Sequence, residues 1–188
     1  MKRISMRNSR ILCNACILAA FLATLAPALG QNSQPVVHHA AFAGTWRLDL
    51  KKSYLGQDHP DANYGFTKTF ELKGSTIVQK DHEVNVDIVG FALPERNSSQ
   101  ELVPDGQEHT AQMPGFFPGM PPTPMRLTVE WQGDNLVTHE SGQSFIGPVT
   151  TARRYYLSED GAELIEVIVG RTTYGDSEQR LVFARASE

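Results

Sequence analysis

The fold of this protein is decided by the stretch Phe42-Ala43-Gly44-Thr45-Trp46-Arg47-Leu48-Asp49-Leu50. From Trp46 to Leu50 every second side chain is apolar, and the two side chains between them, Arg47 and Asp49, are charged. Successive side chains of a strand point to opposite faces, so this alternation predicts a strand with one buried and one solvated face. We take it as the first strand of the folded domain.

The first 30 residues have the pattern of an export signal. Four basic residues precede an apolar run from Ile11 to Leu29, which is typical of a signal peptide. The small residues Ala28 and Gly30 predict cleavage after Gly30, and cleavage after Ala28 is the alternative. A retained membrane anchor is disfavoured, because the apolar run is near the short end of the ~17–25 residues that a spanning helix needs and Pro27 interrupts it.

Both cysteines, Cys13 and Cys16, lie inside this segment. Lipid attachment at Cys16 is a second alternative, although the three residues before it include no leucine. Removal of the signal leaves a chain without cysteine. A disulfide, a thiol nucleophile and a thiolate metal site are then excluded, and packing alone must stabilise the fold.

The charge of the mature chain narrows the range of partners. The full chain has a net charge of −4, and loss of four of its 17 basic residues leaves 13 against 21 acidic residues, or −8. An acidic chain is a poor partner for nucleic acid or anionic lipid, since both require a basic face. We therefore expect an exported monomer, periplasmic or extracellular, that does not insert into a membrane after signal removal.

The remaining chain predicts a short tether and one domain. Residues 31–41 are mostly polar or small, and His38-His39 within them is interpreted as polar linker, with a stray metal pair as the alternative. Residues 42–188 contain short alternating runs, and their turn residues recur roughly every 8–15 positions, which is typical of a barrel or sandwich. No long run has the apolar spacing of a helix.

These runs predict an all-β fold, an antiparallel up-and-down β-barrel of about 8–10 strands. We expect closure of the barrel to remove the exposed sheet edges. After the first strand, the expected strands are 66–72, 76–80, 84–88, 98–103, 125–131, 136–140, 150–157, 162–171 and 180–185. Residues 51–56 are expected to form one helical turn. An insertion at 113–124 is too rich in proline for regular structure.

Gly44-Thr45-Trp46, together with Arg185 near the end of the last strand, resembles the signature of the lipocalin and calycin barrels. The domain is similar in outline to small secreted bacterial lipocalin-like proteins of largely uncharacterised function. The resemblance implies structural roles: Trp46 fills the closed end of the barrel and Arg185 packs across its ring. It also implies a small apolar ligand and no cofactor. The chain departs from many lipocalins in lacking cysteines and in carrying the proline-rich insertion.

The alternation of the last strand supports the same pairing independently. Leu181, Phe183 and Arg185 share one strand face, so Arg185 points into the layer of two core residues. A buried guanidinium needs a partner such as an indole face or carbonyl oxygens. An exposed terminal arginine is the alternative.

Apolar side chains gather in and beside the insertion. They are Phe116, Phe117, Met113, Met120 and Met125. Methionines adapt their shape and phenylalanines supply apolar area, so this group predicts a lid over the barrel mouth and the contacts of a small apolar ligand. A loop that folds back onto the domain is the alternative. A copper site is disfavoured because such sites carry denser methionine spacing with histidines.

Two histidines stand beside carboxylates on expected strands. His82 lies between Asp81 and Glu83, and His139 precedes Glu140. If His82 and His139 met across the sheet with Glu130 or Glu140, they would permit acid–base chemistry such as hydration or isomerisation in an apolar cavity. A surface or core histidine without catalytic role is the alternative. The sequence has no nucleophile motif and no spacing typical of metal ligands.

Three hypotheses therefore follow from the sequence. The first is a non-enzymatic exported barrel that binds a small apolar ligand or an envelope component. The second is a barrel enzyme that uses His82 or His139. The third is a barrel whose interior is filled by its own side chains. An inward-facing histidine–carboxylate pair would favour the enzyme.

Overall fold

The structure is a computed structural model that describes residues 39–56, 63–88, 91–113, 120–144 and 147–186. The predicted signal peptide and nearly all of the tether lie outside these residues. A single 3-10 turn, η1 (His39–Phe42), precedes ten strands. They are β1 (Gly44–Leu48), β2 (Gly65–Lys73), β3 (Thr76–Ile88), β4 (Phe91–Leu102), β5 (Glu108–Met113), β6 (Thr123–Gln132), β7 (Asn135–Ser144), β8 (Gly147–Leu157), β9 (Glu163–Thr172) and β10 (Gly175–Arg185).

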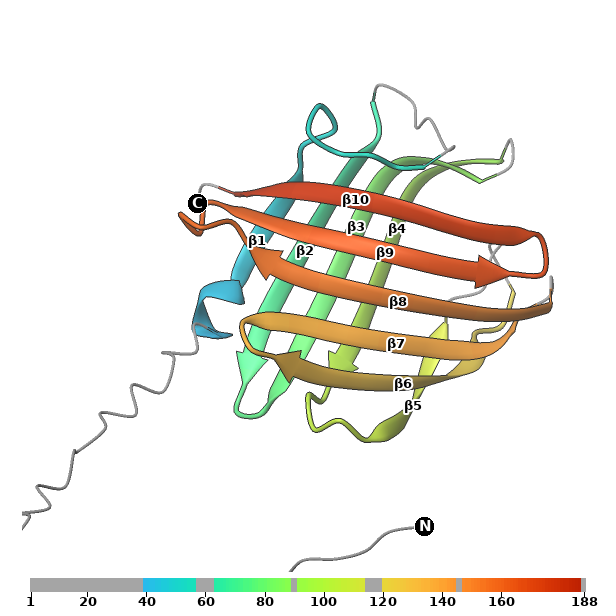
Figure 1. The fold of residues 1–188 in the computed structure, drawn as a ribbon. Helices are drawn as coiled ribbons and strands as arrows, with labels where there is room; N and C mark the ends of the chain where they lie inside the picture. The colour runs from blue at the N-terminus through green and yellow to red at the C-terminus, as the bar shows by residue number, and fades with distance from the viewer. Residues whose placement is uncertain (1–38, 57–62, 89–90, 114–119, 145–146, 187–188) are drawn as a thin grey trace, which may run out of the picture. The chain divides into compact units, whose positions relative to one another are not determined.

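The ten strands form one antiparallel sheet. Strands that follow each other along the chain are paired, with the exception of β4 and β5. The order is β4-β3-β2-β1-β10-β9-β8-β7-β6-β5, so β1 pairs with β10 and the sheet wraps around. This confirms the predicted all-β, up-and-down barrel. In Figure 1, β2 to β4 cross behind β7 to β9 at a steep angle, and the inner faces of these two halves enclose the interior.

The expected complete closure of the barrel is wrong. Strands β4 and β5 are the two ends of the sheet order, so the barrel is nearly closed, with a gap between them. The chain leaves β4 through Val103-Pro104, where proline has no N–H to donate and restricts the residue before it. The turn that follows is bonded to β6 and not to β4: the N–H of Gly106 donates to the carbonyl of Val129 at 2.9 Å.

Two local predictions also differ from the structure. Residues 76–88 form one continuous strand, β3, where two short strands were expected. Its polar positions 81–83 pair with β2 and β4 on both sides, so the ladder holds them in the strand. The helical turn expected at 51–56 is instead a hydrogen-bonded turn, after which Tyr54 pairs with Arg180 of β10.

One end of the barrel is filled by apolar side chains around Trp46, which is fully buried. The indole Nε1 donates to the carbonyl of Phe42 at 3.0 Å. Twelve buried residues pack together here, and we call them the apolar floor. They are Phe42, Trp46, Phe70, Ile77, Leu102, Leu127, Val129, Leu136, Tyr155, Leu164, Leu181 and Phe183.

Arg185 covers Trp46 from the last strand, which is the contact expected from the sequence. Its guanidinium carbon lies 4.1 Å from the centre of the indole ring, a cation–π distance. The two guanidinium nitrogens donate to the carbonyls of Ala43 and Ala41 at 2.9 and 2.7 Å. Gly44 has a φ of +127°, and a Cβ atom there would lie 2.7 Å from Nη1 of Arg185, so only glycine fits beneath this contact.

The two ends of the barrel are distinguished by their turns. The ring of His39 in η1 stacks on Trp131 at 3.5 Å, next to the turn between β6 and β7. Thr123, at the other end of β6, pairs with Met113 of β5. The described ends of the insertion, Met113 and Thr123, therefore lie at the end of the barrel opposite to Trp46.

A polar layer inside the barrel

Charged residues interrupt the inward apolar faces of β2 and β9. Lys68 stands between Phe66 and Phe70 on β2, and its side chain is 1% exposed. Glu166 stands between Leu164 and Ile168 on β9 and is fully buried. Because the strand period is two residues, these side chains share the face of their apolar neighbours and point into the barrel.

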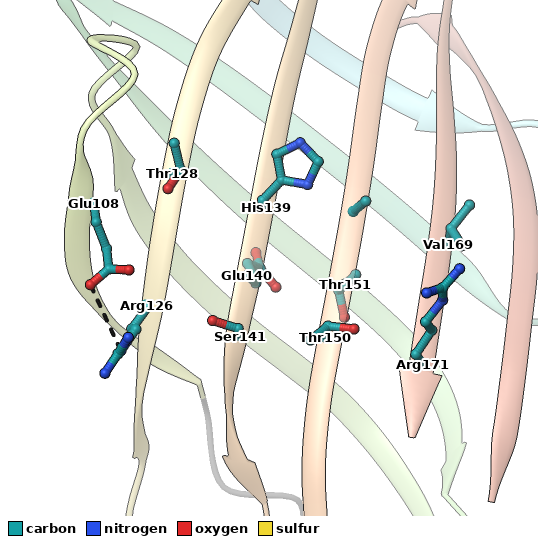
Figure 2. Close-up of a pocket in the computed structure, with 11 residues that line it drawn as sticks. Glu108, Arg126, Thr128, His139, Glu140, Ser141, Thr150, Thr151, Val169 and Arg171 are labelled. Atoms are coloured by element: carbon teal, nitrogen blue, oxygen red, sulfur yellow. Dashed lines mark ion pairs between the residues drawn. The ribbon is translucent and has the colours of Figure 1, made fainter. Parts of the chain in front are cut away.

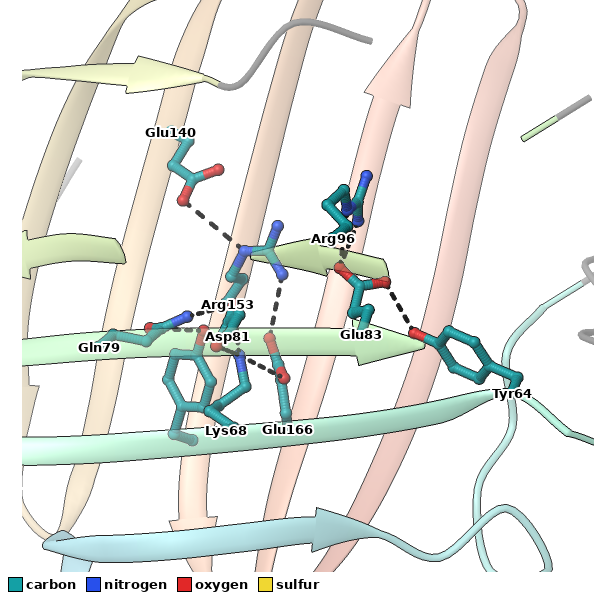
Figure 3. A network of polar contacts seen from close by, with 10 residues as sticks. Tyr64, Lys68, Gln79, Asp81, Glu83, Arg96, Glu140, Arg153 and Glu166 are labelled. Atoms are coloured by element: carbon teal, nitrogen blue, oxygen red, sulfur yellow. Dashed lines mark hydrogen bonds and ion pairs between the residues drawn. The ribbon is translucent and has the colours of Figure 1, made fainter. Parts of the chain in front are cut away.

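These residues join across the interior (Figure 3). Nζ of Lys68 lies 3.2 Å from Oδ1 of Asp81 and 3.4 Å from Oε2 of Glu166. Nη1 of Arg153 donates to Oε1 of Glu166 at 3.0 Å, and its Nε lies 3.7 Å from Oε1 of Glu140. The group links β2 and β3 on one side with β7, β8 and β9 on the other. We call Lys68, Asp81, Glu140, Arg153 and Glu166 the polar layer.

Neighbouring side chains connect the polar layer to the apolar floor. Nε2 of Gln79 donates to Oδ2 of Asp81 at 2.9 Å, and the hydroxyl of Tyr155 donates to Oε1 of Gln79 at 3.5 Å. The ammonium of Lys68 also lies 5.4 Å from the centre of the Tyr155 ring. Tyr155 belongs to the apolar floor, so the polar layer lies directly against it.

A second ion pair lies further along β3. Oε1 of Glu83 accepts from Nε of Arg96 at 3.0 Å, and Oε2 accepts from the hydroxyl of Tyr64 at 3.0 Å (Figure 3). Burial is the main reason why the pKa of Tyr64 is raised, and the Glu83 carboxylate adds to it. Tyr64 is therefore a neutral donor to Glu83.

Three buried oxygens of the inner face have no hydrogen-bond partner among the described residues. They are Oδ1 of Asp81, Oε2 of Glu166 and Oγ1 of Thr138. Thr138 is 2% exposed and lies opposite Arg153 on the adjacent strand. Oδ1 of Asp81 and Oε2 of Glu166 nevertheless lie 3.2 and 3.4 Å from the ammonium of Lys68, so this cation balances the charge of both oxygens.

Part of the polar layer is accessible to solvent. The side chains of Asp81, Glu140 and Arg153 are 18%, 19% and 29% exposed, whereas those of Lys68 and Glu166 are 1% and 0% exposed. All five point inward. The polar layer therefore has a side that solvent reaches, formed by Asp81, Glu140 and Arg153, and a buried side, formed by Lys68 and Glu166.

The electrostatics of the polar layer favour an ionised Glu166. Burial alone would raise the pKa of its carboxyl, but the charges of Lys68 and Arg153 outweigh burial, and the pKa lies below its ordinary value. Burial, with the carboxylate of Glu166 beside it, raises the pKa of Tyr155 well above its ordinary value. The phenol is thus neutral and the carboxylate is charged.

The lowered pKa of Glu166 predicts an acid-sensitive fold. A carboxyl whose pKa is lower in the folded state contributes stability above its unfolded pKa, about 4.3 for glutamate, and loses it as the pH falls through the folded value. The free energy of unfolding should therefore decline as the pH falls below about 4.3. Glu166→Gln should make this decline shallower. Part of the decline should remain, because the exposed carboxyls of Asp105 and Asp160 also have a lowered pKa. Urea titrations at several pH values measure the free energy of unfolding of the wild-type protein and of Glu166→Gln. An equal dependence of this free energy on pH in the two proteins would contradict the role of Glu166.

Of the residues expected to form a lid, the structure describes the side chains of Met120 and Met125 alone. Phe116 and Phe117 lie outside the described residues, as does the side chain of Met113. Met120 is 39% exposed. Met125 was grouped with the insertion, but it is a buried residue of β6, 5% exposed, because its strand alternates inward with Leu127. Its sulfur packs against Gly142 of β7, where a Cβ atom would collide with it.

The predicted meeting of His82 and His139 inside the barrel is wrong. Both histidines are exposed on the outer face, and five strands lie between β3 and β7 in the sheet order. Nδ1 of His82 lies 2.8 Å from Oδ1 of Asn97. Only Glu140 of the three proposed catalytic residues points inward, and it belongs to the polar layer. The strand alternation places each histidine on the opposite face from its inward neighbours, Asp81 and Glu140.

Two hollows lie on the outer surface. One, with a volume of about 350 Å³, runs across β6 to β9 and includes His139, Thr128 and Arg171 (Figure 2). The other, of about 490 Å³, lies over β2 to β4 and includes His82 and Thr67. Glu140 borders the first hollow and Asp81 the second, although their side chains are only 19% and 18% exposed. The exposed side chains of Arg126 and Glu108 pair at 3.7 Å in the first. Exposed ion pairs of this kind are hydrated and contribute little binding energy.

Within the described part of the chain, no group of three or more histidine, cysteine or carboxylate side chains is arranged to hold a metal ion. Within the same residues, no helix is long and apolar enough to cross a membrane.

The polar layer is the feature that the sequence interpretation missed. Its signal was present, since Lys68 falls between two phenylalanines at a spacing of two and Glu166 falls between Leu164 and Ile168 in the same way. A charged residue inside an apolar alternation marks either a strand end or a buried ion pair. Lys68 and Asp81 are 13 residues apart across one hairpin, and Arg153 and Glu166 are 13 apart across another. The contact of Lys68 with Glu166 joins opposite walls of the barrel, so the complete layer becomes visible only in the folded structure.

Comparison with known proteins finds similarity in structure only. No family profile matches the sequence, and no curated protein matches it. A heat-soluble secretory protein from Ramazzottius varieornatus has a TM-score of 0.53 at 11% identity, covering 78% of this chain and 96% of its own. Zebrafish ileal bile acid-binding protein with cholic acid has 0.50 at 13%, covering 78% and 99%. Schistosoma mansoni fatty acid binding protein with arachidonic acid has 0.50 at 15%, covering 79% and 98%.

Proposed function

We propose that this protein, which has the calycin-type β-barrel fold, binds one small, largely apolar molecule inside the barrel without catalysing a reaction on it. The ligand would lie on the solvent-accessible side of the polar layer, with its polar end against the charged side chains. We further propose that the barrel acts as an exported monomer, with residues 1–30 as its signal peptide and the ligand or an envelope component as its partner.

The observation that carries the proposal is the polar layer, whose Asp81, Glu140 and Arg153 point inward and are reached by solvent. A barrel that served only as a rigid body would bury apolar side chains throughout, because an ion pair in the interior is often no more stable than well-packed apolar residues. Here charged side chains interrupt the apolar interior, and the solvent-accessible carboxylates of Asp81 and Glu140 come from opposite walls. Binding sites combine an apolar wall with a few converging polar groups, and this interior has both.

The structural neighbours support an amphipathic ligand. The zebrafish protein was crystallised with cholic acid and the Schistosoma protein with arachidonic acid. Each molecule has an apolar body and a polar end. Barrels of this size hold one small ligand, so the same use of the interior is consistent with the fold of this chain. The acid–base alternative lacks such support, because His82 and His139 are on the outer face.

The location of the site is tested by two tryptophan substitutions at adjacent positions of β9. Ile168 points inward and packs against the apolar floor, whereas Val169 points outward, is 39% exposed and borders the hollow over β6 to β9. Titration with the neutral apolar dye Nile red should saturate at one site. Ile168→Trp should weaken this binding about tenfold or more, equivalent to about 1.4 kcal/mol, and Val169→Trp should leave it unchanged.

The opposite pattern, with Val169→Trp alone weakening the dye, would place binding on the outer surface and contradict the proposal. Circular dichroism melting of both variants checks that each barrel is folded. If Ile168→Trp unfolds the barrel, Ile168→Phe provides the same comparison with a smaller side chain.

Export is tested separately by sequencing the N-terminus of the protein isolated from its own host. The proposal predicts a mature chain that begins at Gln31. A chain that still begins at Met1 would contradict it.

A further inference from the structure

We infer that the polar end of the ligand is a hydrogen-bond donor with positive charge, an amine rather than a carboxylate. This inference rests on the proposed function, since it names the class of molecule that the interior site would take. It departs from the ligands in the zebrafish and Schistosoma structures, which are both acids.

The first step is that the cations of the polar layer already have anionic partners. The ammonium of Lys68 lies within 3.4 Å of carboxylate oxygens of both Asp81 and Glu166. The guanidinium of Arg153 contacts both Glu166 and Glu140, at 3.0 and 3.7 Å. An incoming carboxylate would have to displace one of these partners, which would leave a protein carboxylate unpaired in the interior.

The second step is the charge balance. The polar layer contains two cations, Lys68 and Arg153, and three anions, Asp81, Glu140 and Glu166. A carboxylate ligand would make the net charge of this group more negative, from −1 to −2, whereas an ammonium would bring it to zero. Like charges in a poorly solvated site disfavour each other strongly. The neighbouring Arg96 is occupied by Glu83 and does not alter this balance.

The third step is the hydrogen-bonding character of the two carboxylates that solvent reaches. Asp81 and Glu140, 18% and 19% exposed, accept hydrogen bonds and donate none. An ammonium offers three donors, and a carboxylate offers none.

The carboxylates best placed for the amine are Asp81 and Glu140. Both are partly exposed, at 18% and 19%, and come from opposite walls of the barrel. Glu166 is fully buried behind them and acts by holding Lys68 and Arg153. The amine is thus placed where solvent reaches the polar layer, and its apolar chain extends away from this layer.

The inference is tested with three ligands of equal chain length: dodecylamine, dodecanol and dodecanoate. Each is titrated into the protein at about pH 7, below its micelle concentration, and displacement of Nile red gives the affinity. The amine is charged at this pH, because alkylammonium groups titrate near lysine, at about 10.4. We expect dodecylamine to bind at least tenfold more tightly than dodecanoate, with dodecanol between them.

Two variants separate the polar layer from general surface charge. Asp81→Asn leaves the layer with two cations and two anions, so the preference for the amine should fall to about threefold or less. Glu140→Gln should act in the same direction. Glu159→Gln, on an exposed turn, removes the same charge from the chain as a whole and should leave the preference unchanged.

The outcomes distinguish the inference from the proposed function. Tightest binding of dodecanoate to the wild-type protein, at a site weakened by Ile168→Trp, would overturn the inference and leave the proposed function standing. An amine preference that falls equally in Glu159→Gln would also overturn it, since surface charge would then be its cause. If none of the three ligands displaces Nile red, the proposed function itself is contradicted.

Discussion

Lys68→Met lowers the free energy of unfolding by about 3–5 kcal/mol, which is the usual cost of removing one partner from a buried ion pair. The substitution keeps the length and the apolar stem of the side chain but removes the ammonium that lies between Asp81 and Glu166. Their carboxylates then stand in the interior without a cation between them. Urea denaturation followed by tryptophan fluorescence measures the change.

The charge origin of this effect is tested by a compensating substitution. Lys68→Met combined with Glu166→Gln removes one charge of each sign, so the double variant should be more stable than Lys68→Met alone. Lys80→Met, on the outer face of β3 where the ammonium pairs with exposed Glu71, is the matched control and should change the unfolding midpoint little. A double variant that is less stable than the single one would contradict the account of the polar layer.

Trp46→Ala has the second large effect, a loss of about 3–5 kcal/mol, because it removes a fully buried ring from the apolar floor and leaves a cavity. It also removes the surface on which the guanidinium of Arg185 lies. The same substitution at Trp131, which is only partly buried at the edge of this core, should cost clearly less. Thermal and urea unfolding of both variants measure the difference.

Equal losses at Trp46 and Trp131 would contradict the assignment of Trp46 as the centre of the closed end. If Trp46→Ala does not fold, Trp46→Phe keeps an aromatic ring and part of the packing. It should then yield a folded barrel of reduced stability.

The sequence predicted the barrel because its signals are local. Alternation from Trp46 to Leu50 and the short turns between strands depend only on neighbouring residues, and they gave the all-β, up-and-down arrangement. Gly44, Trp46 and Arg185 were linked through a resemblance, and the structure brings them together with β1 paired to β10. The gap between β4 and β5 was missed because closure depends on the path of the chain around Pro104.

The site was harder to predict because alternation gives the two faces of a strand without saying which one is inside. On β3 the inward face carries Gln79, Asp81 and Glu83, so it appears more polar than an interior face normally does. His82, between Asp81 and Glu83, lies on the other face and is exposed. The pairs of Lys68 with Glu166 and of Arg153 with Glu140 depend on the register and curvature of the whole sheet.

The claim that the ligand binds inside the barrel, against the polar layer, is tested most directly by nuclear Overhauser effects between bound dodecylamine and methyl groups of the labelled protein. Met125 and Ile168 point inward on β6 and β9, and Val169 points outward beside Ile168. The account predicts contacts from the alkyl chain to the methyl groups of Met125 and Ile168 and none to Val169. Contacts to Val169 without contacts to Met125 or Ile168 would contradict it.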